Sequence, residues 1–179
     1  MTEFGLGAYS PYFIYLVGLN IVFIRQLARQ TKAPQIWTLC VSFIYLASVG
    51  YLCFTPPLTI NIADFGQMKP YYLGPVPMNP IPFRGIGLDF FLNILLTVPL
   101  GLCASLFLKQ PHFKSLLYLG FAAGFSIELC QCLLDSGLDL GRWVDINDVL
   151  MNALGVCLGW LLYQGLWHWP WFQKFKLNR

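Results

Sequence analysis

Apolar residues fall into five long runs that are separated by polar or proline-containing segments. Each run has about the 20 residues that an α-helix needs to cross the hydrocarbon core of a bilayer. The five predicted spanning helices are Tyr9–Leu27, Ile36–Phe54, Leu88–Leu108, Leu116–Leu134 and Val149–Trp167. The first run has no basic residue before it and ends in Arg25 and Arg29, so it predicts a retained helix rather than a cleavable signal peptide.

The composition argues against a soluble protein. Hydrophobic residues make up 57% of the 179 residues and charged residues 11%, whereas soluble domains carry about 25% charged residues. A soluble fold of this size could not bury so much apolar side chain beneath a polar surface. We therefore predict an all-α membrane protein, a bundle of about five transmembrane helices. The six cysteines lie in apolar runs without a C-x-x-C pair, and we interpret them as packing residues.

The basic residues predict how the helices are oriented. Eight of the eleven Lys and Arg residues lie between spans one and two, between spans three and four, or after span five, which places them on one side of the membrane. All eight Asp and Glu residues lie on or near the other side. The positive-inside rule assigns the basic side to the cytoplasm. We therefore expect the N-terminus outside, the C-terminus in the cytoplasm, and a basic cytoplasmic tail over residues 169–179.

The connection over residues 55–87, on the outer side, is long and holds seven of the twelve prolines. Proline fixes φ and lacks an amide donor, so Pro75–Phe83 is predicted to form neither a regular helix nor a central strand. We expect an extended or polyproline-like lid over the outer ends of the helices. Residues 1–35 are expected to hold the first helix and a cytoplasmic loop, and residues 36–168 the main transmembrane domain.

Polar and small residues recur about every four positions along the last three spans. Each stripe is small toward the basic side and polar toward the other side. The stripes comprise Asp89, Asn93, Thr97, Gly101 and Ser105; Gly120, Gly124, Glu128, Gln131 and Asp135; and Asp145, Asp148, Asn152, Gly155 and Gly159. Because G-x-x-x-G spacings let helix backbones approach closely, we predict that these spans pack through their small residues. Their polar ends would then converge at the outer leaflet.

An ionisable side chain inside a span is costly, and its default interpretation is a functional site. Glu128 lies six residues from the predicted outer end of its span, which is about 9 Å at the helical rise. Arg84 and Arg142 are the cations placed to pair with it. We predict an outward-facing ligand pocket with Glu128 at its floor. Its other predicted residues are Arg84, Asp89, Asn93, Gln131, Arg142, Asp145, Asp148 and Asn152.

A structural role competes with this interpretation, because polar residues also hold helices together. For Asn93, Gln131 and Asn152 both interpretations stay open, and Asp145 also suits the N-cap of the last span. Both histidines lie on the basic side, which argues against zinc or Ser-His catalysis. The residues at 145 and 148 could hold Mg²⁺ or Ca²⁺, but no spacing requires a metal, and we predict no cofactor.

Four stretches of the chain together resemble the VanZ-like family. They are Asn79-Pro-Ile-Pro-Phe-Arg84, Asn93-Ile-Leu-Leu-Thr-Val-Pro-Leu-Gly101, Glu128-Leu-Cys-Gln131 and the pattern Arg142-x-x-Asp145-x-x-Asp148-x-x-x-Asn152 within the run from Gly141 to Gly159. The similarity covers about residues 40–165, and the first span lies outside it. The family's pattern falls on Asn93, Pro99, Glu128, Gln131, Arg142, Asp145, Asp148 and Asn152.

The resemblance implies a multi-pass protein of the bacterial cytoplasmic membrane. The namesake of the VanZ-like family is associated with low-level resistance to teicoplanin, a lipid-bearing glycopeptide antibiotic. Antibiotic resistance is therefore a function that the resemblance implies for this cell-envelope protein, although membership alone does not establish it.

Three functions are consistent with these residues. In the one that we favour, the protein is not an enzyme: its pocket binds the head group of a lipid-linked envelope molecule or a lipoglycopeptide, with Arg84 and Arg142 contacting phosphate or carboxylate. In the second, it is a membrane hydrolase or transferase with Glu128 as general acid or base. In the third, it is a structural or partner-binding membrane subunit. The lack of an obvious nucleophile or metal-ligand spacing favours the first. Membrane lipids are expected partners, and nucleic acid is not.

Overall fold

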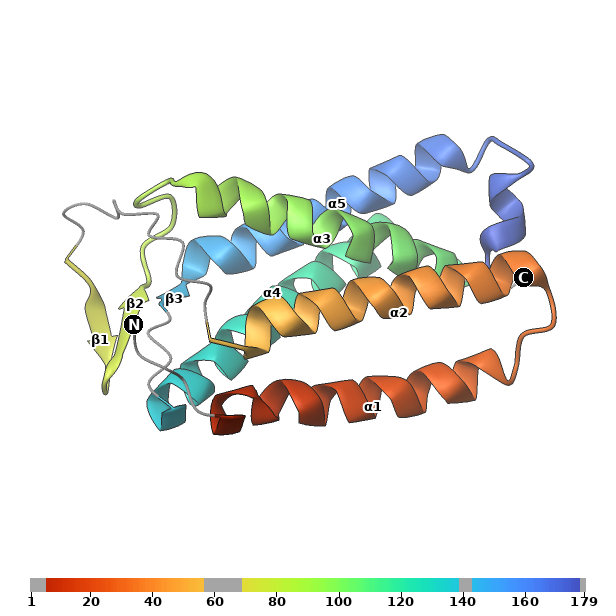
Figure 1. Ribbon diagram of the computed structural model, residues 1–179. Helices are drawn as coiled ribbons and strands as arrows, with labels where there is room; N and C mark the ends of the chain where they lie inside the picture. Colours follow the sequence, from red (N-terminus) through yellow and green to blue (C-terminus); the bar gives the residue numbers. More distant parts are fainter. Residues whose placement is uncertain (1–5, 57–68, 139–142, 178–179) are drawn as a thin grey trace.

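The computed structural model describes residues 6–56, 69–138 and 143–177, and five long helices dominate this part of the chain (Figure 1). They are α1 (Ser10–Leu27), α2 (Ala33–Phe54), α3 (Leu88–Phe107), α4 (Phe113–Leu138) and α5 (Ile146–Leu166). All five are long and apolar enough to cross a membrane, which confirms the five predicted spans. The largest difference between a predicted and an observed helix end is at the C-terminal end of α4, which is predicted at Leu134 and observed at Leu138.

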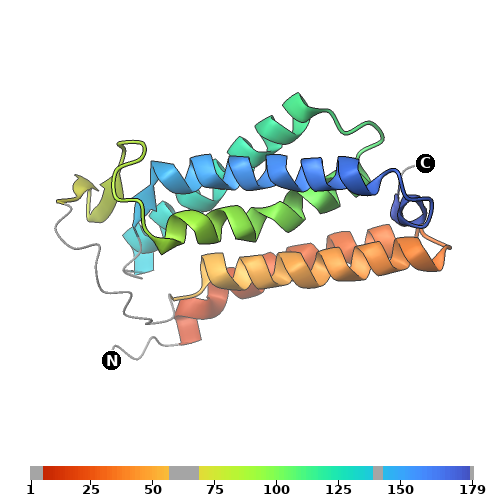
Figure 2. The same cartoon turned by 90° about the horizontal axis from the view of Figure 1, so that it is seen from above.

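The helix α5 is the centre of the bundle, because α3 and α4 both pack against it. Half of the α5 span is buried, whereas none of the α1 span is. Figure 2 shows α1 and α2 together along one flank of the bundle. Helix α1 therefore presents its large apolar side chains outward, as a peripheral membrane helix does.

Glycines allow the backbone of α5 to lie directly against its two neighbours. A Cβ atom placed on Gly159 of α5 would lie 2.0 Å from the carbonyl oxygen of Val98 on α3. One placed on Gly120 of α4 would lie 2.7 Å from the Cα of Ala153 on α5. The other glycines with such contacts between these helices are Gly101, Gly124 and Gly155. The prediction that the last three spans pack through their small residues is therefore confirmed.

A small three-stranded sheet, in the order β1-β2-β3, lies at one end of the bundle (Figure 1). Strands β1 (Tyr71–Leu73) and β2 (Val76–Asn79) form an antiparallel hairpin. Strand β3 (Val144–Asp145) directly precedes α5 and pairs with β2 in parallel. The sheet therefore joins the connection after α2 to the start of the central helix.

The middle strand of this sheet contains Pro77, so the prediction that this stretch forms no central strand is wrong. In a hairpin with a two-residue turn, the residue pair next to the turn exchanges hydrogen bonds and the following pair does not. Pro77 lies opposite Tyr72 in that second pair, so its position needs no amide donor toward β1. On its other side, β3 pairs only with Met78 and Asn79. The missing amide therefore costs no bond in either ladder.

The C-terminal segment folds back across the opposite end of the bundle, where the short 3-10 helix η2 (Phe172–Phe175) contacts α2. Thr38 Oγ1 donates a hydrogen bond to the carbonyl oxygen of Phe175 at 2.8 Å. The buried Lys176 donates from Nζ to the hydroxyl of Tyr163 at 2.9 Å. The predicted basic tail thus includes a packed segment.

Replacing Gly159 by leucine is expected to destabilise the bundle strongly, because the new side chain would overlap the backbone of α3. Overpacking of this kind costs about 1–3 kcal/mol or more. The measurement is the thermal midpoint of the purified protein in detergent. The matched control is Gly18→Leu on α1, where an added Cβ meets nothing within 4 Å. Equal midpoints for the two variants would contradict the packing described here.

Candidate functional site

The sheet, α4 and the start of α5 meet in a cluster of buried polar side chains at one end of the bundle. Its most buried members are each at most 9% exposed. They are Asn79, Glu128, Gln131, Asp145, Asn147 and Asn152. Polar groups that are buried in an apolar helix bundle need hydrogen-bond partners to offset the loss of water.

Asp145 is the centre of this cluster and the N-cap of α5, which is one of the two roles that the sequence leaves open for it. Its Oδ1 accepts a hydrogen bond from the amide of Asn147 at 2.7 Å, and both carboxylate oxygens accept from Asn79 Nδ2 at 3.1 Å. Its own amide donates to Oε2 of Glu128 at 2.9 Å. One residue therefore connects β2, β3, α4 and α5.

Burial raises the pKa of the Asp145 carboxyl above its ordinary value. The hydrogen bonds from Asn147 and Asn79 lower that pKa, and the nearby carboxylate of Asp89 raises it. Burial is the largest of these effects, so the folded protein holds a proton on Asp145 more readily than an exposed aspartate does.

Two asparagines fix the turn that follows β2. The carbonyl oxygen of Arg84 accepts from Nδ2 of Asn79 at 3.1 Å and from Nδ2 of Asn147 at 3.0 Å. The amide of Phe83, whose φ is +61°, donates to Asn147 Oδ1 at 2.6 Å. These bonds hold a backbone conformation that a bulky residue rarely adopts.

Sequence reasoning did not select Asn79 or Asn147 for the site. Asn79 begins one of the stretches that carry the family resemblance, and Asn147 lies two residues after an N-cap aspartate. Both signals are in the sequence, but neither says that the two side chains meet at the same carbonyl group.

Arg84 does not pair with Glu128, contrary to the prediction. Its guanidinium lies over the ring of Tyr71, 5.7 Å from the centroid, and donates to the carbonyl oxygen of Lys69 at 3.2 Å. The turn points this side chain toward β1, so Arg84 contributes its backbone carbonyl to the cluster. The other predicted cation, Arg142, lies outside the described residues.

Two acceptor atoms in the cluster have no hydrogen-bond partner among the residues that the structure describes. They are Oδ1 of Asp148 and Oδ1 of Asn152, which are both buried and belong to residues four apart on α5. Leaving a buried acceptor unpaired costs about 1–3 kcal/mol. The two atoms together mark a place where a donor group from another molecule would be stabilising.

The remaining predicted residues surround this pair to different degrees. Asp148 is near the carboxylates of Glu128, Asp145 and Asp89, and the amide of Asn93 interacts with it. Gln131 is buried on the same helix as Glu128, with Asp135 one turn further. The described part of the chain contains no group of three His, Cys, Asp or Glu side chains arranged to hold a metal ion. The site as described offers buried hydrogen-bond acceptors.

An apolar cavity of about 360 Å³ lies at the same end of the bundle, between α1, α2 and α4. Its lining includes Pro11, Phe54, Cys130 and Leu134. Cys130 directly precedes Gln131 along α4, so the cavity and the polar cluster lie at a similar depth but on different faces of this helix.

Comparison with known proteins identifies a protein family. A family model described as VanZ/LLP1 matches residues 12–168 of the chain. The match begins inside α1, so it is longer than the stretch from about residue 40 that carries the resemblance in the sequence and includes most of the first span. No curated protein and no solved structure matches the chain.

The raised pKa of Asp145 predicts a pH-dependent stability. Because the folded state binds this proton more tightly than the unfolded chain, the stabilisation is full below the unfolded pKa of about 4 and declines as the pH rises through the folded pKa. Asp145→Asn keeps an N-cap oxygen and removes the titration. Its thermal midpoint is expected to match that of the wild type near pH 4 and to exceed it at pH 7.

The control for this experiment is Asp145→Ala, which has no capping oxygen. It should lose about 1 kcal/mol of stability at both pH values. A difference between wild type and Asp145→Asn that stays constant from pH 4 to pH 7 would show that the carboxyl does not titrate as described.

Proposed function

Because the chain belongs to the VanZ/LLP1 family, we propose that it binds the head group of a lipid-linked cell-envelope molecule or a lipoglycopeptide at the buried polar cluster. The observation that carries this proposal is the pair of unpartnered acceptors, Asp148 Oδ1 and Asn152 Oδ1. Sugar hydroxyls and amines are donors, so a head group that carries them would complete these hydrogen bonds.

The apolar cavity beside Cys130 supports a ligand with a lipid part. A molecule with both a head group and an acyl or isoprenoid chain could place one in the polar cluster and the other against α1, α2 and α4. Lipid-linked envelope precursors and lipoglycopeptides share this chemistry. Capture of a lipoglycopeptide is the route by which the protein would contribute to teicoplanin resistance.

An enzymatic role for Glu128 has less support. The residue is 4% exposed, and its Oε2 accepts the Asp145 amide. A carboxylate in this position holds the start of α5, which is a positioning role rather than that of a general acid or base. We therefore propose a binding protein.

The proposal includes an orientation in the bacterial cytoplasmic membrane. The start of α1 and the sheet lie at one end of the bundle and η2 at the other (Figure 1). All the described acidic residues belong to the sheet end, and the segments at the other end are basic. The positive-inside rule then places the polar cluster toward the outside and the C-terminus in the cytoplasm.

Cysteine labelling in intact cells tests this orientation. In a background without the native cysteines, Pro70→Cys and Leu138→Cys are expected to react with a membrane-impermeant maleimide added outside. Lys109→Cys, between α3 and α4, should react only after the cells are permeabilised. The reverse pattern would overturn the orientation.

Native mass spectrometry of the protein extracted gently from its own membrane tests the binding proposal. Asn152→Leu and Asp148→Asn should retain about tenfold less of the lipid that the wild type carries, since a lost hydrogen bond of about 1.4 kcal/mol changes affinity tenfold. Because the Asn152 acceptor has no protein partner, Asn152→Leu should not lower the thermal midpoint.

The matched control for this measurement is Ser126→Ala, which alters an exposed hydroxyl on α4. Added teicoplanin, scored by its mass, separates a lipoglycopeptide from an envelope precursor. Equal retention of the same lipid by the wild type and by well-folded Asn152→Leu and Asp148→Asn, with no teicoplanin bound, would indicate that the cluster only holds helices together.

A further inference from the structure

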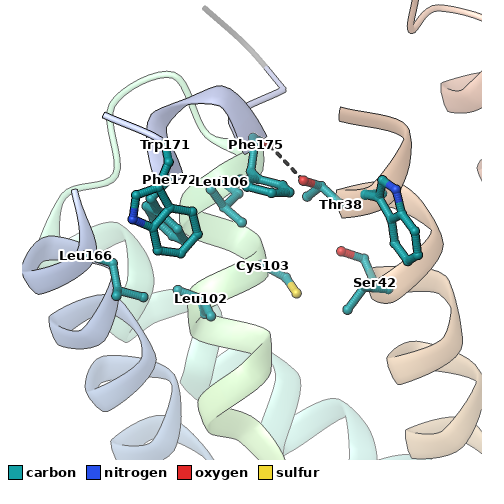
Figure 3. Close-up of a pocket in the computed structure, with 11 residues that line it drawn as sticks. Thr38, Ser42, Leu102, Cys103, Leu106, Leu166, Trp171, Phe172 and Phe175 are labelled. Carbon is teal, nitrogen blue, oxygen red and sulfur yellow. Dashed lines mark hydrogen bonds between the residues drawn. The ribbon is translucent and has the colours of Figure 1, made fainter. Parts of the chain in front are cut away.

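A second cavity lies at the opposite end of the molecule, between α2, α3, the end of α5 and η2 (Figure 3). Its volume is about 470 Å³, within the range of about 300–1,000 Å³ of ligand sites. Four residues of α2, leucines of α3 and α5, and aromatic side chains of η2 form most of its wall. The lipid-linked ligand proposed above does not use this cavity, because the polar cluster is at the other end of the bundle.

One polar atom inside this apolar cavity is unsatisfied. Ser42 is 4% exposed, and the buried Oγ has no partner among the described residues beyond a weak interaction with the Cys103 thiol. Figure 3 shows its side chain pointing from α2 toward Cys103, whose sulfur is only a weak acceptor. By contrast, Thr38, one turn earlier, donates to the carbonyl oxygen of Phe175. The Ser42 hydroxyl is therefore a donor that a ligand carbonyl inside the cavity would satisfy.

The mouth of this cavity has the composition of a membrane interface. Trp37 and Trp171 line it and are 66% and 52% exposed, and tryptophan is enriched where hydrocarbon meets head groups. Lys174 is exposed on η2, between two lining residues. Every acidic residue within the described part of the chain lies at the other end. The local charge is therefore positive and fits an anionic head group.

The spacing between Lys174 and Ser42 suits the distance from a phosphate to an ester. Thr38 bonds to Phe175, so η2 lies at the same depth along α2 as Thr38. Ser42 is four residues further along α2, which is about 6 Å at the helical rise. A phosphate near Lys174 would place the ester carbonyls of the same lipid one helical turn deeper, at the depth of Ser42.

From these observations we infer that the cavity binds an anionic glycerophospholipid from the leaflet at the basic end of the bundle. One acyl chain fills the space between α2 and α3. Its ester carbonyl accepts a hydrogen bond from Ser42 Oγ, and its phosphate lies beside Lys174. The lipid then fills the space that separates α2 from the core of the bundle.

The test uses the full-length protein in lipid nanodiscs and vesicles of phosphatidylglycerol or phosphatidylcholine. Brominated phosphatidylglycerol is expected to quench the fluorescence of the wild type more strongly than brominated phosphatidylcholine, because two tryptophans line the mouth. Native mass spectrometry of the same samples should show about one tightly held phosphatidylglycerol for each chain.

Three variants separate the parts of this site. Ser42→Ala removes the donor, and Leu102→Trp fills the cavity. Both variants should retain at least fivefold less phosphatidylglycerol than the wild type. Lys174→Gln should bind both lipids with little preference. The matched control is Leu161→Trp on the exposed face of α5, which should leave retention unchanged.

Ser42→Ala keeps the test decisive if the larger side chain of Leu102→Trp prevents folding, because Ser42 loses only a weak interaction with the Cys103 thiol. Equal retention of the two lipids by the wild type, or undiminished phosphatidylglycerol in Ser42→Ala, would overturn the inference. Loss of binding at the polar cluster in Asn152→Leu does not affect this outcome, so the two proposals fail independently.

Discussion

The direct contact of the α5 backbone with the backbones of α3 and α4 determines the rest of this structure. Lipid is as apolar as leucine, so helices in a membrane gain little from burying large side chains and depend on close packing instead. Gly159 against Val98 and Gly120 against Ala153 provide that closeness. Once the small residues of the three helices meet, the polar residues on the same faces must converge at one end. The location of the polar cluster is thus a consequence of where the glycines lie.

At that end, the hydrogen bonds of Asp145 fix the relative positions of the polar side chains. Its amide and carboxylate bond to Glu128, Asn79 and Asn147, and the asparagines in turn hold the carbonyl of Arg84. Most of the polar groups here therefore form hydrogen bonds within the protein. The acceptors of Asp148 and Asn152 lack such bonds among the described residues, and the proposed binding function is attributed to these two atoms.

Periodic features of the chain were predictable, and pairings between distant segments were not. The spans follow from apolar length, and the contact among the last three follows from residues spaced four apart, because both are properties of a single helix face. The pairing of β2 with β3 joins Asn79 to Asp145 across 66 positions, and neither strand is long enough to show alternation.

The rule against proline in a central strand failed at Pro77 because a two-residue β3 needs no amide there. The turn after β2 points the Arg84 side chain toward β1. The predicted pairing of Arg84 with Glu128 was wrong because this turn depends on contacts between distant segments.

The fold-back of the segment after α5 makes elements that are distant along the chain depend on one another. The amide of Leu177 donates to the carbonyl of Leu106, while Gln35 and Thr38 of α2 bond to Lys176 and Phe175. Residues 172–177 thus link α2, which lies at the flank of the bundle, to α3 in its core. The docking of the first hairpin, α1 and α2, on the core therefore depends in part on a segment more than 100 residues away along the chain.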